Sequence, residues 1–201
     1  MRPPTRPGYV TVGLAVAICA GPAEAHLNSS GMGPIYDGLL HFLTSPEDLL
    51  PALALALLAG MRGAAYGRRA LFTLPAAWLL GGAAGLATTA TNGSAVLSSL
   101  WFLLLGGLVV ADAKLSLRVT TVLAALLGLV HGYLNGTGMG LSASAVLTVL
   151  GLGTAVFILI ALTAAFVVQL RAHWARIAVR VAGSWIAASG LLLLGWAVRG
   201  S

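Results

Sequence analysis

Apolar segments of helix length, separated by short polar connections, dominate the chain from residue 46 onward. Each is compatible with the roughly 20 residues that a membrane-spanning helix needs. The segments are residues 46–61, 70–90, 94–112, 119–135, 143–169 and 178–198. This pattern predicts an all-α fold, a polytopic membrane helical bundle with six transmembrane helices.

Composition narrows the class of protein further. Of the 201 residues, 59% are hydrophobic and only 8% are charged, and the mean hydropathy is +0.97. Soluble domains carry about 25% charged residues, so a water-soluble fold is excluded and membrane lipid is the expected surrounding. The formal net charge of +6 indicates membrane topology rather than nucleic-acid binding, because the basic residues fall between apolar segments.

The first 25 residues are typical of an export signal. A basic start, MRPPTR, precedes the short apolar run YVTVGLAVAICA and the small-x-small sequence AEA. We expect cleavage after Ala25, which makes residues 1–25 a signal peptide and residues 26–201 a single transmembrane domain; the alternative is an uncleaved first helix. Cleavage there makes His26 the first residue of the mature protein. Its amine and imidazole are then a candidate pair for capturing metal; the alternative is that His26 is only part of a terminal tail. The single cysteine, Cys19, lies in the signal segment, so neither a disulfide nor a thiolate metal site is expected.

Basic residues predict the orientation of the helices. Nine Lys and Arg residues follow residue 25, and eight of them fall in or beside the first, third and fifth connections. These eight are Arg62, Arg68, Arg69, Lys114, Arg118, Arg171, Arg176 and Arg180, with Arg199 as the exception. The positive-inside rule places their side in the cytoplasm. We therefore expect a multi-pass protein of the bacterial inner membrane with a periplasmic mature N-terminus, in agreement with the export signal.

Side chains that can bind a metal gather at two places on the outward side of this topology. His41, Glu47 and Asp48 precede and begin the first apolar segment. His131 and Asn135 lie near the outward end of the fourth, and their i, i+4 spacing puts both on one helix face. Ionisable groups at membrane depth are costly and are functional candidates by default. Imidazole nitrogen with carboxylate oxygen suits a divalent transition metal such as nickel, cobalt or zinc.

The first of these groups also has an ordinary structural interpretation. Ser45 as N-cap and Pro46 at the first helical position are typical of a helix start. Glu47 and Asp48 then stabilise the positive end of the helix dipole. His41 can likewise be an interfacial or packing histidine. Both interpretations stay open at this point.

Three further polar residues have open roles. Asp37, in a Gly-rich loop, is a turn residue or an outer ligand. Asp112 is expected to pair with Lys114 or Arg118, or to mark a metal exit point. His173, among arginines, is expected to be a solvated loop residue. Gly residues in the apolar segments, in runs such as GGAAG, predict close helix packing.

At its polar motifs the chain resembles the HupE/UreJ family, small membrane proteins encoded with hydrogenase and urease systems and regarded as nickel or cobalt permeases. Family members have an export signal and enter the first helix through His-x5-Asp-His, which is His41-x5-Glu47-Asp48 here. A later helix in the family carries Phe-His-Gly-x-Ala, followed closely by Glu. This chain has VHGYL at that place, so that His131 and Gly132 match, and then NGT.

Two departures from the family pattern change the ligands that the resemblance implies. The Asp-His pair becomes Glu47-Asp48, which loses an imidazole, and the later Glu becomes Thr137. A site with fewer nitrogens and more oxygens binds late transition metals less tightly. That suits a transporter, which must release its cargo, and it also fits another cation or a member that has lost transport.

Together, the residues and the resemblance predict an inner-membrane permease, and not an enzyme, that captures nickel or cobalt at the periplasmic face. The expected metal site contains His41, Glu47, Asp48, His131, Asn135 and His26. The metal is cargo, so no permanently bound cofactor is expected, and no particular oligomer or partner protein is indicated. One alternative is a non-transporting metal-binding or assembly accessory subunit. A membrane-embedded enzyme is disfavoured because the sequence has no HExxH pair.

Overall fold

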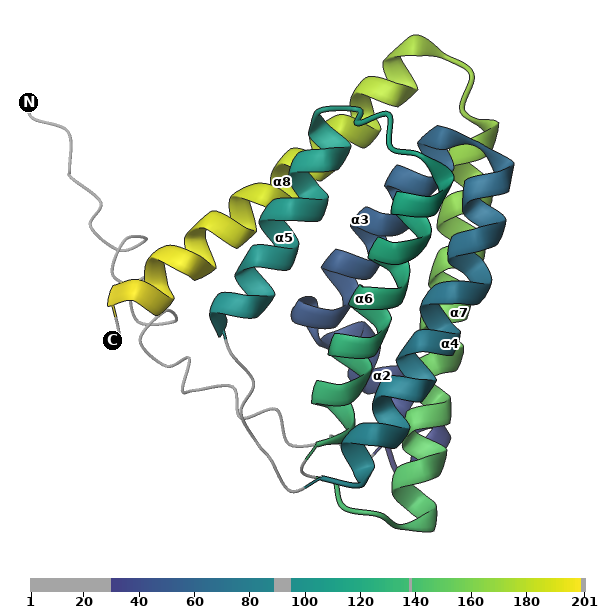
Figure 1. The fold of residues 1–201 in the computed structure, drawn as a ribbon, viewed down its shortest axis with the longest axis vertical. Coiled ribbons are helices and arrows are strands. Elements are labelled where there is room, and N and C mark those ends of the chain that lie inside the picture. Colours follow the sequence, from purple (N-terminus) through teal and green to yellow (C-terminus); the bar gives the residue numbers. More distant parts are fainter. Residues whose placement is uncertain (1–29, 89–94, 138, 200–201) are drawn as a thin grey trace, which may run out of the picture.

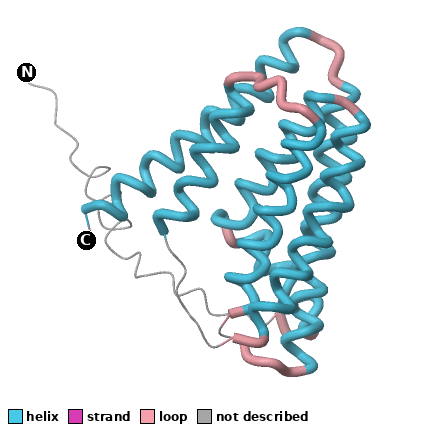
Figure 2. The backbone as a smooth tube through the Cα atoms, in the orientation of Figure 1, coloured by secondary structure: helices cyan, strands magenta, loops and turns pink. Residues whose placement is uncertain are grey.

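Figure 1 shows the chain in a computed structural model that describes residues 30–88, 95–137 and 139–199. The predicted signal peptide, its cleavage site and His26 lie outside these residues. The described part is entirely helical, with short turns between the helices (Figure 2). The helices are α2 (Pro34–Thr44), α3 (Pro46–Arg62), α4 (Ala64–Leu86), α5 (Ala95–Val110), α6 (Leu117–Gly136), α7 (Ala143–Gln169) and α8 (His173–Arg199).

The helical membrane class agrees with the sequence, but six spans are not confirmed. In the described residues, α4, α6, α7 and α8 are each long and apolar enough to cross a membrane. The first predicted span, residues 46–61, corresponds to α3 alone, which reaches that length only together with α2, a helix that was not predicted. The two helices meet at a 75° bend. The apolar helix α5 is shorter than a full span. The structure therefore contains four candidate spans, or five if α2 and α3 count as one.

The bend between α2 and α3 has a local cause at Ser45. Pro46 follows it, and a residue that precedes proline is disfavoured in the helical conformation. Ser45 accordingly adopts an extended backbone, with φ −98° and ψ 97°. Its carbonyl oxygen accepts from the backbone N–H groups of Asp48 and Leu49, while its side chain makes no cap hydrogen bond. The predicted helix start is therefore present, without the predicted side-chain cap.

Helix α3 lies at the centre of the bundle. Eleven of its 17 residues are buried, and it contacts every other described helix. Around it, α4 pairs with α6, α2 with α7, and α5 with α8. Figure 1 shows α5 and α8 leaning away from the remaining helices. This pair contacts the rest of the bundle mainly through α3.

Glycines let the paired helices approach to backbone contact. On α6, a Cβ added at Gly132 would lie 2.1 Å from the carbonyl oxygen of Trp78 on α4. On α4, a Cβ added at Gly81 would lie 2.3 Å from the carbonyl oxygen of Leu129 on α6. No other residue fits at such positions without a backbone shift, so the packing role predicted for the small residues is confirmed.

The two ends of the bundle differ in charge. The connections α3–α4, α5–α6 and α7–α8 meet at one end, which is uppermost in Figure 1 and which we call the basic end. The eight basic residues named above lie in or beside these connections, so they share one side as the sequence predicts. At the opposite end, the acidic end, α3 begins with Glu47 and Asp48.

Candidate functional site

A buried polar cluster of Asp48, His131 and Asn135 lies between α3 and α6 at the acidic end. The Nδ1 atom of His131 lies 2.9 Å from Oδ1 of Asp48. The Asn135 side-chain amide donates to the same Oδ1 at 3.1 Å and to the backbone oxygen of His131 at 2.8 Å. Asp48 and His131 are each only 3% exposed. The structure thus joins the start of the first apolar segment to the end of the fourth.

Local sequence places each member of this cluster. Asp48 is in the first turn of α3, whose start is fixed at Pro46. His131 and Asn135 lie one turn apart on α6 and therefore project from the same face. Gly132 lets α6 contact the backbone of α4, which brings His131 close to Trp78.

Aromatic rings surround the imidazole of His131. Its ring centroid lies 5.6 Å from that of Trp78 on α4 and 6.3 Å from that of Trp101 on α5. Phe42 on α2 packs edge-on against Trp78 at 5.6 Å. Together with Asp48 on α3, five helices therefore contribute to one enclosed site. Its low dielectric strengthens any electrostatic interaction made inside it.

Unsatisfied polar atoms concentrate at this cluster. Within the described residues, five buried side-chain nitrogen or oxygen atoms lack a hydrogen-bond partner. Four of them are Nε2 of His131, Oδ1 of Asn135, and Nε1 of Trp78 and of Trp101; the fifth is Nε of Arg62 at the basic end. Buried polar atoms are normally paired, so a group of unpaired ones at one place indicates a site for a polar ligand.

The hydrogen bonds determine which atoms of the cluster remain available. When Asp48 is ionised, its carboxylate can only accept, so Nδ1 of a neutral His131 ring donates to it and the lone pair of the ring lies on Nε2. Because the Asn135 amide nitrogen donates twice, its oxygen is left as a free acceptor. A carboxylate that holds one imidazole nitrogen while the other faces a metal is the common support for metal-binding histidines. Asp48 is therefore positioned to orient His131.

The remaining predicted ligands do not join this cluster directly. His41 lies on α2 and is half-buried, and Glu47 is exposed in the first turn of α3. The Glu47 carboxylate interacts electrostatically with His41, His131 and Asp48, so all four lie in one region. Even so, no group of three or more His, Cys, Asp or Glu side chains with metal-binding spacing is present in the part of the chain that the structure describes.

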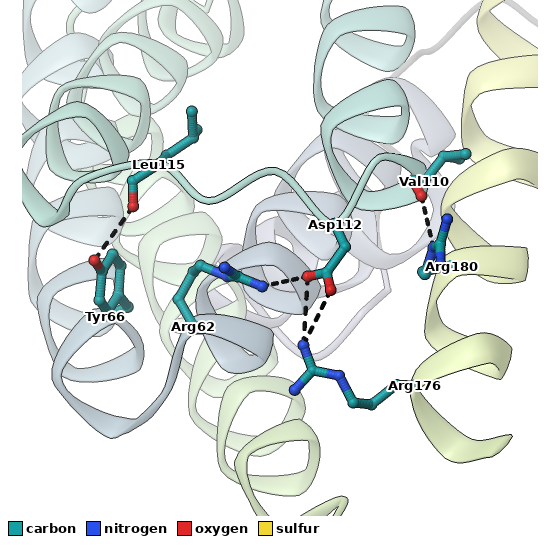
Figure 3. Close-up of polar contacts among 7 residues, drawn as sticks. All are labelled: Arg62, Tyr66, Val110, Asp112, Leu115, Arg176 and Arg180. Carbon is teal, nitrogen blue, oxygen red and sulfur yellow. Dashed lines mark hydrogen bonds and ion pairs between the residues drawn. The ribbon is translucent and has the colours of Figure 1, made fainter. Parts of the chain in front are cut away.

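A second polar cluster, at the basic end, was not predicted from the sequence. Asp112 accepts hydrogen bonds from Arg62, at the end of α3, and from Arg176, at the start of α8, the latter at 3.2 Å to Oδ2 (Figure 3). The prediction that Asp112 pairs with Lys114 or Arg118 is therefore wrong. Asp112 adopts the left-handed conformation with φ 46°, in the turn after α5. Its partners lie 50 and 64 residues away, beyond the reach of local pattern analysis.

Further contacts hold the α5–α6 connection in place. The hydroxyl of Tyr66 donates to the backbone oxygen of Leu115, and Nε of Arg180 donates to that of Val110 (Figure 3). The side chain of Arg62 is only 12% exposed. This basic-end cluster therefore ties α3, α4 and α8 to a single connection.

Two other sequence interpretations can be compared with the structure. Asp37 lies in the first turn of α2 and accepts a hydrogen bond from the backbone N–H of Ser30, seven residues earlier, at 2.5 Å. The prediction that places Asp37 in a loop is therefore wrong, and its carboxylate ties the segment before α2 to that helix. His173 is exposed at the first position of α8, in agreement with a solvated residue.

The long apolar helices, the glycine contacts between them and the buried ionisable pair define a helical, multi-pass membrane protein with a candidate ligand site inside the bundle. A family model described as "HupE / UreJ protein" matches residues 14–193. The chain belongs to this family, which is associated with nickel or cobalt uptake or with accessory functions for hydrogenase and urease. No curated protein and no solved structure matches the chain.

Proposed function

We propose that this protein is an inner-membrane permease for a divalent transition-metal cation, with nickel or cobalt as the leading candidates. The observation that carries the proposal is the buried, unpaired Nε2 of His131, held by Asp48 through Nδ1. Neutral imidazole is the most common protein ligand for such metals. Membership of a family associated with nickel or cobalt uptake supports the same class of cargo.

In this mechanism the cation enters at the acidic end, which faces the periplasm. Glu47 and His41 lie closest to solvent and attract the cation first. The cation then binds Nε2 of His131 and Oδ1 of Asn135, the two buried side-chain acceptors that have no hydrogen-bond partner in the described part of the chain. Asp48 keeps the ring in orientation and supplies negative charge in a site of low dielectric.

A weak site is appropriate for this task. One imidazole, one amide oxygen and nearby carboxylates form a set with few nitrogen ligands, which binds late transition metals less tightly than several imidazoles do. Moderate affinity allows the cation to leave toward the basic end. No P-loop occurs in the sequence, so the energy comes from a gradient or from a partner protein.

One observation favours the alternative of a non-transporting accessory subunit. The Asp48 carboxylate already accepts hydrogen bonds from two side chains on α6. These bonds can have a purely structural role, which is to hold α3 against α6. An accessory subunit of this kind binds metal or assists assembly of a membrane or metalloenzyme system, and it does not move metal by itself.

Uptake of labelled nickel and cobalt by cells that express the full-length protein tests the proposal. We expect His131→Ala to reduce accumulation to the level of cells without the protein, because the main ligand atom is removed. His173→Ala is the matched control, since it removes an exposed imidazole at the other end of the bundle. Variant abundance in the membrane is measured in parallel.

Two outcomes would contradict the proposal. Accumulation by His131→Ala equal to that of the unchanged protein excludes a role for the polar cluster in transport. Metal binding by the purified protein without uptake in cells favours the accessory subunit.

A further inference from the structure

A surface groove between α4 and α7 near the basic end is independent of the polar cluster. Its volume is about 290 Å³. The walls are mainly small or apolar side chains, and Arg68 and Gln169 are its polar lining residues.

The sequence of the two helices explains the shape of the groove. On α4, Ala64, Gly67, Arg68 and Leu71 have the i, i+3, i+4, i+7 spacing of one helix face. A Cβ added at Gly67 would lie 3.3 Å from that of Ala164 on α7, so the helices cross closely there. Small side chains on both sides of this crossing leave an apolar channel open to the surface.

Charge at the mouth of the groove is unbalanced. Arg68 is exposed and has no carboxylate partner among the ion pairs of the described residues. The basic end carries eight Lys and Arg residues but, in the same part of the chain, Asp112 as its only acid. Asp112 already pairs with Arg62 and Arg176. A ligand at Arg68 therefore has to bring its own negative charge.

We propose that this groove binds an anionic phospholipid of the leaflet that faces the basic end. One acyl chain lies along the small residues between α4 and α7, and the phosphate pairs with the Arg68 guanidinium, with the Gln169 amide as a second polar contact. Basic pockets between transmembrane helices are suited to acidic lipid headgroups. A free phosphate ion matches Arg68 alone and leaves the apolar channel unused. The positive-inside rule makes this the cytoplasmic leaflet.

Native mass spectrometry of the full-length protein in detergent, titrated with phosphatidylglycerol, tests the proposal. Phosphatidylcholine, which has no net charge, is the comparison lipid. We expect Arg68→Gln to weaken phosphatidylglycerol binding about fivefold, and binding of phosphatidylcholine to change little. Arg69→Gln is the matched control because this neighbouring arginine is also exposed but does not line the groove, and its effect should stay below about twofold.

A second variant tests the apolar channel separately from the charge. Ala165 is exposed and lines the groove, so Ala165→Phe should fill the channel without disturbing the core. We expect it to weaken binding of both lipids while the unfolding temperature stays unchanged. Inorganic phosphate at millimolar concentration should not displace phosphatidylglycerol.

Four results would overturn the proposal. Equal effects of Arg68→Gln and Arg69→Gln indicate diffuse surface attraction, and displacement by inorganic phosphate indicates a simple anion site. No effect of Ala165→Phe shows that the channel is unused. A second copy of the chain, retained in place of lipid and lost in Ala165→Phe, identifies the groove as a protein interface. Metal uptake is not part of this test, so the two proposals fail independently.

Discussion

Asp48 and Asp112 each join helices that are far apart in the sequence, one near either end of α3. Both carboxylates accept hydrogen bonds from two side chains. The partners of the two carboxylates differ in charge and in whether any of their own polar atoms stay without a hydrogen bond. Asp112 faces two guanidinium groups, so its charge is neutralised within the protein. Asp48 faces an imidazole and an amide, and two acceptor atoms of those partners remain unpaired.

This difference separates a structural ion pair from a candidate ligand site. A carboxylate that already pairs with two arginines does not attract a metal cation. The cation would have to approach or displace two guanidinium groups that carry the same positive charge. The polar cluster around Asp48 presents unpaired acceptors in an enclosed, apolar place and gains by receiving a cation. Unpaired polar atoms on the hydrogen-bond partners of a buried acid are therefore a better indicator of a ligand site than the burial of the acid itself.

The two clusters also depend on different kinds of packing. His131 is placed by direct backbone contact between α6 and α4 at Gly132. Asp112 lies in a turn and is reached by the long side chains of Arg62 and Arg176 (Figure 3). Flexible side chains can follow a small displacement, whereas a backbone contact cannot. The acidic end should therefore tolerate less change in helix spacing than the basic end.

Gly132→Ala should have the largest effect. The new Cβ would lie 2.1 Å from the carbonyl oxygen of Trp78, so α6 has to move away from α4 by about 1 Å. We expect a loss of about 3 kcal/mol in the free energy of unfolding, the upper part of the range for overpacking. Because His131 is the neighbouring residue, metal binding should weaken as well. Denaturation of the purified protein in detergent, followed by circular dichroism, measures the first effect.

Gly107→Ala on α5 is the matched control for this substitution. A Cβ at Gly107 has no neighbour within 4 Å, and alanine favours the helix by up to about 1 kcal/mol over glycine. Its unfolding free energy should rise slightly or stay unchanged. Equal losses for the two variants would show that backbone contact at Gly132 does not position α6.

Asp112→Asn should have the next largest effect, on stability alone. The side chain of Arg62 is only 12% exposed and would lose its charged partner, together with Arg176. Loss of one partner of a buried ion pair costs about 3–5 kcal/mol, and Asp112 itself is 29% exposed, so we expect about 2 kcal/mol. Metal affinity, measured by calorimetry, should not change. A loss of metal affinity would contradict the assignment of Asp112 to the fold.

Local sequence rules predicted much of the fold. Apolar length predicted α6 and α7 closely, whereas α4 and α8 begin several residues before the predicted segments at 70–90 and 178–198. The small residues around Gly81 predicted close helix packing, and the structure shows that the partner of this face of α4 is α6. The break at Ser45 was not predicted, although Pro46 is its cause. A helix start before an apolar segment was interpreted as the beginning of a span, whereas here it joins two helices that bend by 75°.

The candidate site was predicted in part, for a physical reason. Charged and polar groups in apolar sequence are rare, so His131 and Asp48 stood out, and the topology placed them on one side of the membrane. Sequence does not give the rotation of a helix about its axis. Asp48 faces His131 and Glu47 is exposed, a distinction that depends on how α3 packs. Trp78 and Trp101, which line the site, resembled ordinary packing residues of apolar helices.

Asp48→Asn should have the smallest effect on stability and should sharpen the comparison most. Asparagine keeps an oxygen that can accept from Nδ1 of His131 and from the Asn135 amide, so we expect the unfolding free energy to fall by less than about 1 kcal/mol. The negative charge behind the imidazole is lost, however, and loss of such a supporting carboxylate weakens metal binding about 10- to 100-fold. Calorimetric titration with nickel and cobalt measures this change, with Asp37→Asn as a control that removes an acid outside the polar cluster. A stability loss as large as that of Asp112→Asn, with unchanged metal affinity, would place Asp48 with Asp112 as a structural group and leave the bundle without its candidate ligand site.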